Sequence, residues 1–143
     1  MSKNKKNNNL IFNHIGIFVK NIKKSEKYLT YLFKTQKKSK LVLDKRLCIK
    51  VKLYYDKDKI CYELVEPYGK KNAVSGFLKR GSNILNHIAY SSKTFDKTIN
   101  DLKDKKFIQL SIVNYSKVFK GRIVFFLSPL GYIIEIIEDK KNR

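Results

Sequence analysis

The sequence predicts an α+β fold of two βαβββ modules that form a cupped mixed sheet. The first observation behind this prediction is a repeated motif, because Asn13-His14-Ile15-Gly16 returns as Asn86-His87-Ile88-Ala89. The second is that the elements expected after each motif follow the same order. The third is that each copy carries one histidine in its first strand and one glutamate in its last. An internal repeat of this kind indicates the fold more strongly than any single predicted element.

The first module is expected to span residues 10–67. Alternating apolar residues predict strands at Phe12–Val19 and Leu47–Tyr55, because successive side chains of a strand point to opposite faces. A stripe of Ile22, Leu29 and Phe33, with Tyr28 and Leu32 beside it, predicts a helix between these strands. The complete set of elements is a strand at Phe12–Val19, a helix at Ile22–Phe33, a short strand at Leu41–Leu43, and a hairpin of Leu47–Tyr55 with Lys59–Glu66.

The second module is expected at residues 85–138, after a connector at residues 68–84 whose residues 73–79 form one or two helical turns. A helix at Thr94–Lys105 is indicated because Phe95, Ile99 and Leu102 share one face. Strands are expected at Leu85–Ser91, Phe107–Val113, Arg122–Leu127 and Tyr132–Glu138. Residues 10–138 would then form a single domain, with a disordered tail at residues 1–9 and a charged tail at residues 139–143.

The chain is strongly basic, with 32 Lys and Arg against 12 Asp and Glu and a net charge of +20. Only Arg46, Arg80, Arg122 and Arg143 are arginines, and the lysines are spread along the chain rather than grouped. Because no nucleic-acid-binding motif accompanies this charge, nucleic acid is not expected as a partner. An anionic small molecule would be attracted to such a protein.

The sequence also favours a cytoplasmic protein that does not bind membranes. No apolar run approaches the roughly 20 residues that a membrane helix needs, and the Lys/Asn-rich start does not match a signal peptide. Cys48 and Cys61 are expected in neighbouring strands, but a turn centred near Lys57 would place Cys48 opposite Glu66. A disulfide is therefore not expected, which fits a reducing compartment.

The candidate site consists of the two histidines and two glutamates of the repeat. Glu63 follows His14 by 49 residues, and Glu135 follows His87 by 48. Both glutamates lie in apolar strands, where a carboxylate without a partner is costly to bury. Two imidazoles and two carboxylates suffice to hold one divalent metal, such as Zn, Ni, Co, Fe or Mn. The alternative is that each histidine bonds within the core and each glutamate faces solvent, but the recurrence of the pair favours the metal.

These features resemble the vicinal oxygen chelate superfamily, which includes glyoxalase I, bleomycin-resistance proteins and methylmalonyl-CoA epimerase. The stretches Glu63-Leu-Val-Glu-Pro-Tyr-Gly69, Val74-Ser-Gly-Phe-Leu78 and Leu85-Asn-His-Ile-Ala89 are most similar to the epimerase and its relatives. The ending Phe126-Leu-Ser-Pro-Leu-Gly-Tyr-Ile-Ile-Glu135 is similar to the final hairpin of the superfamily. The resemblance implies that His14, Glu63, His87 and Glu135 hold one metal, which chelates two neighbouring substrate oxygens and stabilises an enolate or related anion.

The function expected from this resemblance is that of a metal-dependent isomerase or lyase of the epimerase type. It would move a proton next to the carbonyl of a small anionic carbonyl compound or the thioester of an acyl-CoA. Glu135 is expected to exchange this proton, with Glu63 as the second candidate. A homodimer is compatible with this prediction.

Besides a specialised enzyme of a sugar or polyketide pathway, two alternatives remain open. Some epimerases have glutamine where this chain has Glu63, and a glutamate is the ligand of nickel-type glyoxalase I, so a lactoylglutathione lyase is the first alternative. Some epimerases also carry a further catalytic glutamate near the position of Ile49 or Lys50, where the nearest carboxylate in this chain is Asp44. The second alternative is a non-catalytic protein that binds a small molecule, as in the antibiotic-sequestering members.

Overall fold

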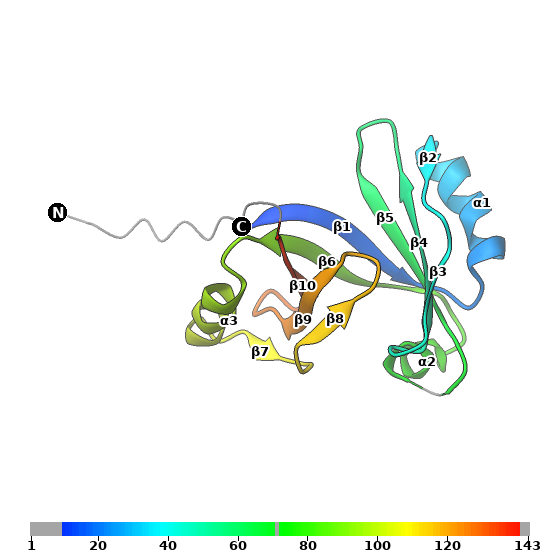
Figure 1. The fold of residues 1–143 in the computed structure, drawn as a ribbon. Coiled ribbons are helices and arrows are strands. Elements are labelled where there is room, and N and C mark those ends of the chain that lie inside the picture. The colour runs from blue at the N-terminus through cyan, green and yellow to red at the C-terminus, as the bar shows by residue number, and fades with distance from the viewer. Residues whose placement is uncertain (1–9, 71, 141–143) are drawn as a thin grey trace. The chain divides into compact units, whose positions relative to one another are not determined.

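The fold was obtained as a computed structural model that describes residues 10–70 and 72–140 (Figure 1). The tail predicted at residues 1–9 and the last three residues of the tail predicted at residues 139–143 lie outside this part of the chain. Within these ranges, no helix combines the length and the apolar character needed to cross a bilayer. The elements are β1 (Ile11–Phe18), α1 (Ile22–Phe33), β2 (Lys37–Lys38), β3 (Val42–Asp44), β4 (Ile49–Tyr55), β5 (Cys61–Pro67), α2 (Ala73–Leu78), β6 (Ile84–Ser92), α3 (Phe95–Asp104), β7 (Ile108–Gln109), β8 (Asn114–Ser116), β9 (Gly121–Leu127) and β10 (Ile133–Glu138).

The elements repeat the same order in two halves, as the sequence predicts. Each half begins with a strand and a helix and ends with a long antiparallel hairpin, which is β4–β5 in the first half and β9–β10 in the second. Between helix and hairpin, β2 and β3 both pair with β4, and β7 and β8 both pair with β9. Among the described residues, ten strands form a mixed sheet in the order β2-β4-β5-β1-β6-β10-β9-β7, with β3 and β8 off this path. The predicted α+β class with its mixed sheet is confirmed.

A serine stands at the break between the two short strands of each half. The hydroxyl of Ser39 accepts a hydrogen bond from the Leu53 N–H at 2.9 Å, and that of Ser111 accepts one from the Phe125 N–H at 3.0 Å. In both places the side chain takes over the role of a backbone acceptor where the regular ladder is interrupted. The strand predicted at Phe107–Val113 is therefore wrong in extent, since only Ile108–Gln109 of it forms a strand.

The chain divides into two compact units. Among the described residues, unit 2 comprises those within Asn13–Ile88, and unit 1 comprises residues 10–12 together with residues 89–140. Strands β1 and β6 contribute residues to both units, because the first boundary falls inside β1 and the second inside β6.

In unit 2, α1 covers one face of the strands. The Asn21 side chain caps the helix by accepting from the Lys24 N–H at 2.8 Å, and a buried cluster joins the helix to the sheet through Val19, Ile22, Leu29, Tyr54, Tyr62 and Leu64. Tyr62 and Leu64 face this cluster, so Glu63 between them points to the opposite face of β5. Tyr28 and Leu32, predicted to lie beside the apolar stripe, are 61% and 64% exposed because only one narrow side of α1 contacts the sheet.

The β4–β5 hairpin has a different register from the one predicted. Tyr55 pairs with Cys61, and Lys50, rather than Cys48, lies opposite Glu66. The reason is a turn of five residues, in which the Asp56 carboxylate accepts from the Asp58 N–H at 2.9 Å and the Ile60 N–H at 3.0 Å. The prediction that no disulfide forms holds in this register, because both cysteines are free.

In unit 1, α3 packs on the β9–β10 hairpin. The buried cluster consists of Phe95, Ile99, Leu102, Val124, Phe126, Ile134 and Ile136. Because Ile134 and Ile136 both face this cluster, Glu135 points to the other face of β10. Its backbone partner on β9 is Phe125. Each glutamate of the repeat thus lies on the face of its strand that the helix of its own unit does not cover.

Candidate metal centre

Three neighbouring strands of unit 2 bring His14, Glu63 and His87 together. β1 runs parallel to β5, with Gly16 opposite Glu63. His14 lies two residues before Gly16 and therefore on the same face of β1 as position 16. His87 belongs to β6, the strand that follows β1 in the sheet order. All three side chains are buried, with exposed fractions of 0% for His14, 6% for Glu63 and 2% for His87. The alternative prediction that each glutamate faces solvent is wrong for Glu63.

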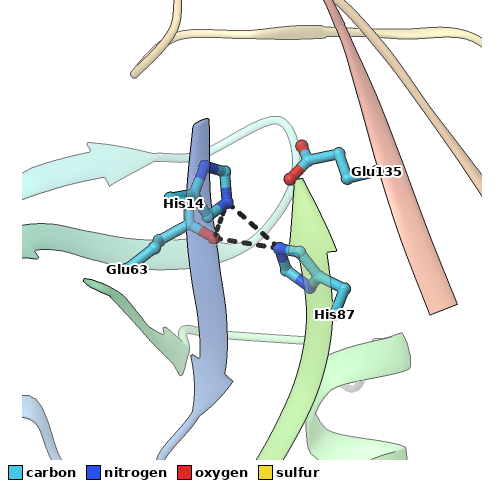
Figure 2. Close-up of side chains that lie close together, drawn as sticks. All are labelled: His14, Glu63, His87 and Glu135. Carbon is cyan, nitrogen blue, oxygen red and sulfur yellow. Dashed lines mark hydrogen bonds and ion pairs between the residues drawn. The ribbon is translucent and has the colours of Figure 1, made fainter. Parts of the chain in front are cut away.

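The polar atoms of these three side chains converge on one point (Figure 2). The two Nε2 atoms lie 3.2 Å apart, and Oε1 of Glu63 lies 3.4 Å from Nε2 of His14 and 3.5 Å from Nε2 of His87. Each residue therefore offers one ligand atom to the same small volume. Such convergence of two imidazoles and a carboxylate is typical of a metal centre, because a buried polar group without a metal usually forms a hydrogen bond with one partner.

The electrostatics of Glu63 follow from this arrangement. Burial alone would raise the pKa of its carboxyl group, but the charge of His14 in its protonated form and hydrogen bonds from the Nε2–H groups of the protonated imidazoles act against it. Together these interactions hold the pKa of Glu63 well below its usual range. Glu63 is therefore a carboxylate at neutral pH, which is the protonation state that a metal ligand requires.

Gly16 provides the space that the His87 ring occupies. A Cβ atom built on Gly16 would overlap Cε1 and Nε2 of His87, well inside van der Waals contact. The ring of His14 meets the same imidazole edge-on, with centroids 5.3 Å apart and an interplanar angle of 80°, and Phe18 meets it at 6.0 Å. The absence of a side chain at position 16 is thus a condition for the observed position of His87.

An asparagine precedes each histidine and contacts its other ring nitrogen. Nδ1 of His14 lies 2.8 Å from Oδ1 of Asn13, and Nδ1 of His87 lies 2.9 Å from Oδ1 of Asn86. The sequence displays both asparagines and Gly16 within the repeated motif, but their roles are visible only once the side chains are placed.

The fourth predicted residue, Glu135, lies in β10 of unit 1. Its side chain is buried, with an exposed fraction of 2%, so the alternative in which it faces solvent is wrong here also. Asp44, the carboxylate nearest to the position of the further epimerase glutamate, is buried in unit 2 and accepts from the Leu47 N–H at 3.0 Å. Its carboxylate caps the turn that leads into β4.

The donor set fits a divalent transition metal. Two neutral imidazole nitrogens and a carboxylate oxygen suit Zn, Ni, Co, Fe and Mn, whereas Ca²⁺ and Mg²⁺ prefer oxygen ligands alone. The buried position would protect such an ion from water. The three residues of unit 2 could bind a metal, and the chemistry of the ligands does not select one metal among these five.

The two halves of equal element order and the buried histidine and glutamate residues place this chain in a class that comparison with known proteins identifies. The family model described as the glyoxalase/bleomycin resistance protein/dioxygenase superfamily matches residues 13–126, and the chain belongs to this superfamily. The resemblance predicted from the sequence motifs is thereby confirmed. A comparison with curated proteins found no significant match in sequence.

Solved structures with the same fold include several epimerases. A hypothetical protein from Bacillus halodurans C-125 superposes with a TM-score of 0.80 at 20% identity, covering 94% of this chain and 97% of that chain. Methylmalonyl-CoA epimerase from Mycobacterium tuberculosis gives 0.74 at 16% identity, with 89% and 86% covered. A variant of the Streptomyces coelicolor methylmalonyl-CoA epimerase, in complex with 2-nitronate-propionyl-CoA, gives 0.73 at 18% identity, with 90% and 96% covered. At these identities the likeness concerns the fold.

Proposed function

We propose that the protein is a metal-dependent isomerase or lyase that moves a proton next to a carbonyl or thioester, in the manner of methylmalonyl-CoA epimerase. The observation that carries this proposal is the convergence of His14, Glu63 and His87 within 3.5 Å in the core of unit 2. A structural role alone does not require three buried ionisable groups to meet at one point, because such burial opposes folding unless the groups are compensated.

In this proposal, Glu135 supplies the fourth ligand. Three observations support this role. Glu135 is buried in β10, it lies on the face of β10 that α3 does not cover, and it is equivalent to Glu63 in the repeat. A bound divalent metal would supply Lewis-acid stabilisation of the negative charge that develops on a substrate oxygen. The histidines would serve only to hold the ion, because each uses both ring nitrogens in the site.

The glutamates differ in their proposed roles. Glu135 has isoleucine on both sides in sequence and would take the proton from the carbon next to the carbonyl and return it. Glu63 would complete the ligand set, because its Oε1 lies 3.4 Å and 3.5 Å from the Nε2 atoms of the two histidines. The substrate class proposed is a small anionic carbonyl compound or an acyl-CoA, supported by the net charge of +20 and by the acyl-CoA analogue bound to the Streptomyces epimerase.

The test combines metal analysis with isotope exchange. The purified protein should contain about one divalent transition metal per chain, and His14→Ala or His87→Ala should remove it. In D₂O, the loaded protein should exchange the α-proton of acyl-CoA thioesters. Retention of the metal in the double variant His14→Ala/His87→Ala would contradict the metal site. A loaded protein that binds acyl-CoAs or other ligands without exchange would instead support the sequestering alternative.

The two glutamates can be separated by isosteric substitution. Glu135→Gln should retain at least part of the metal but lower the exchange rate by roughly 10²–10⁴, the usual cost of losing a positioned base. Glu63→Gln should be milder, because an amide oxygen can still bind the metal. The role assignment would be overturned if Glu63→Gln were the more damaging change at equal metal content. Exchange of hemithioacetals rather than acyl-CoAs would favour the lactoylglutathione lyase alternative, which the carboxylate at position 63 supports.

A further inference from the structure

The asparagine in each copy of the repeated motif has no part in the function proposed so far. Asn13 and Asn86 are neither ionisable nor among the predicted ligands, yet each precedes a histidine of the site and contacts its Nδ1 atom through Oδ1, at 2.8 Å and 2.9 Å respectively. The second contact is fully buried.

The chemistry of this contact determines which ring nitrogen carries the proton. The oxygen of an amide side chain only accepts hydrogen bonds, so the Nδ1 atom facing it must be the donor. A neutral imidazole has a single N–H, and therefore Nε2 of the same ring is left with a lone pair. The Nε2 atoms of both rings are the ones that converge with Glu63.

We propose that Asn13 and Asn86 are positioning residues that hold His14 and His87 in the Nδ1–H tautomer and so direct both Nε2 lone pairs into the metal site. The contact joins consecutive residues of one strand, so each strand carries its own orienting group and needs no other element to set the tautomer. This inference rests on the proposed metal site but not on the proposed reaction. Outer-shell hydrogen bonds of this type commonly change metal affinity by about 10–100-fold.

The first test uses the metal-free wild-type protein and requires neither activity nor a substituted residue. Long-range ¹H–¹⁵N correlation spectra of the imidazole rings, recorded where the rings are neutral, report which nitrogen carries the proton. We expect the Nδ1–H tautomer for both histidines. An Nε2–H tautomer in the wild type would overturn the proposal, whatever the protein catalyses.

The second test removes the acceptor and keeps the shape. Asn13→Leu and Asn86→Leu should each allow the Nε2–H tautomer of the following histidine and weaken Co²⁺ binding by about 10-fold or more. Asn13→Asp and Asn86→Asp keep an acceptor oxygen and should retain both the tautomer and the affinity. Asn100→Leu, on the exposed side of α3, is the matched control and should change neither quantity.

The outcomes separate the orienting role from a merely structural one. If the leucine variants bound Co²⁺ as tightly as the wild type with an unchanged tautomer, the asparagines would serve stability alone and the proposal would fail. If the leucine variants did not fold, the wild-type spectrum and the aspartate variants would still decide the question. Loss of isotope exchange in a variant with normal tautomer and Co²⁺ affinity would concern the proposed reaction instead.

Discussion

At the scale of single residues, the candidate metal centre depends on residues that are not ligands. Glycine at position 16 leaves room for one imidazole, and the two asparagines contact the ring nitrogens that point away from the site. A site assembled in this way requires little rearrangement when a metal binds, since the rings are already held in place by their neighbours.

The role of Gly16 can be tested by adding one methyl group. Gly16→Ala should displace the His87 ring, because the new Cβ would overlap it, and should lower metal affinity by an order of magnitude or more. We expect the substitution to cost about 1–3 kcal/mol in stability, as overpacking usually does. Metal titration and urea unfolding measure the two effects. The control is Gly76→Ala in α2, where a Cβ would meet no atom within 4 Å. Normal metal affinity in Gly16→Ala would show that His87 does not need its observed position.

Among residues, the three that converge in unit 2 could be predicted from sequence, but the residues that support them could not. The recurrence of histidine and glutamate at nearly equal spacing identified the three residues that meet in unit 2. The function of Gly16 could not be predicted, because it depends on the ring of a residue from another strand, 71 positions away. Nothing in local periodicity indicates which strand will lie beside which glycine.

At the scale of elements, long apolar strands and amphipathic helices followed the sequence pattern closely, whereas short edge strands did not. The helix at Ile22–Phe33 was predicted with its observed bounds because its cap and stripe are local features. The division of the edge strands depends on side-chain bonds from Ser39 and Ser111 to a partner strand, which no local pattern encodes. The predicted register of the β4–β5 hairpin was wrong for a similar reason, since the Asp56 side chain determines the length of the turn.

Three elements of unit 1 are joined by Arg122. Its guanidinium donates to both carboxylate oxygens of Glu138, each at 3.0 Å, and to Asp96 at the start of α3 at 2.9 Å and 3.0 Å. The ring of Phe95 lies 4.7 Å below the same guanidinium. β9, β10 and α3 are therefore held together by one charged side chain as well as by their apolar core.

This ion pair predicts an acid-sensitive contribution to stability. The hydrogen bonds from Arg122 lower the pKa of Glu138 from its ordinary 4.5, so the folded state binds fewer protons than the unfolded state near that pH. The stabilisation is then complete above about pH 4.5 and is lost as the pH falls through the lowered pKa. Glu138→Gln should cost about 1–3 kcal/mol near pH 7, and the difference from wild type should shrink as the pH falls through the lowered pKa of Glu138.

Urea unfolding at several pH values measures this difference. Asp104→Asn, which removes an exposed carboxylate near the end of α3, should change stability little at any of these pH values and serves as the control. A difference between wild type and Glu138→Gln that did not depend on pH would show that the contribution of Glu138 is not electrostatic.

At the scale of the whole molecule, metal binding should be linked to folding. The three candidate ligands of unit 2 come from β1, β5 and β6, which are widely separated in sequence, so the unfolded chain does not present them together. An ion that binds only the folded state stabilises it by about 2.7 kcal/mol at a free concentration of 100 times Kd. We expect Co²⁺ or Ni²⁺ to raise the free energy of unfolding by that amount in the wild type and by much less in His87→Ala.

Ca²⁺ is the matched control for this measurement, because it prefers oxygen ligands and should produce little change. Thermal unfolding followed by circular dichroism, with and without each ion, is sufficient to compare the two proteins. An equal increase in wild type and His87→Ala would place the stabilising ion elsewhere.

The two copies of the repeated motif share their first three residues, Asn-His-Ile, and differ at the fourth. Position 16 is glycine, whereas its counterpart, position 89, is alanine. A tandem chain assembled from two copies of the second half would therefore carry alanine beneath the imidazole and would fail to form the centre, however well it folded. A tandem chain made from two copies of the first half would carry glycine at both positions. Of the two symmetric chains that gene duplication or protein engineering could produce, only the second leaves room for the ring.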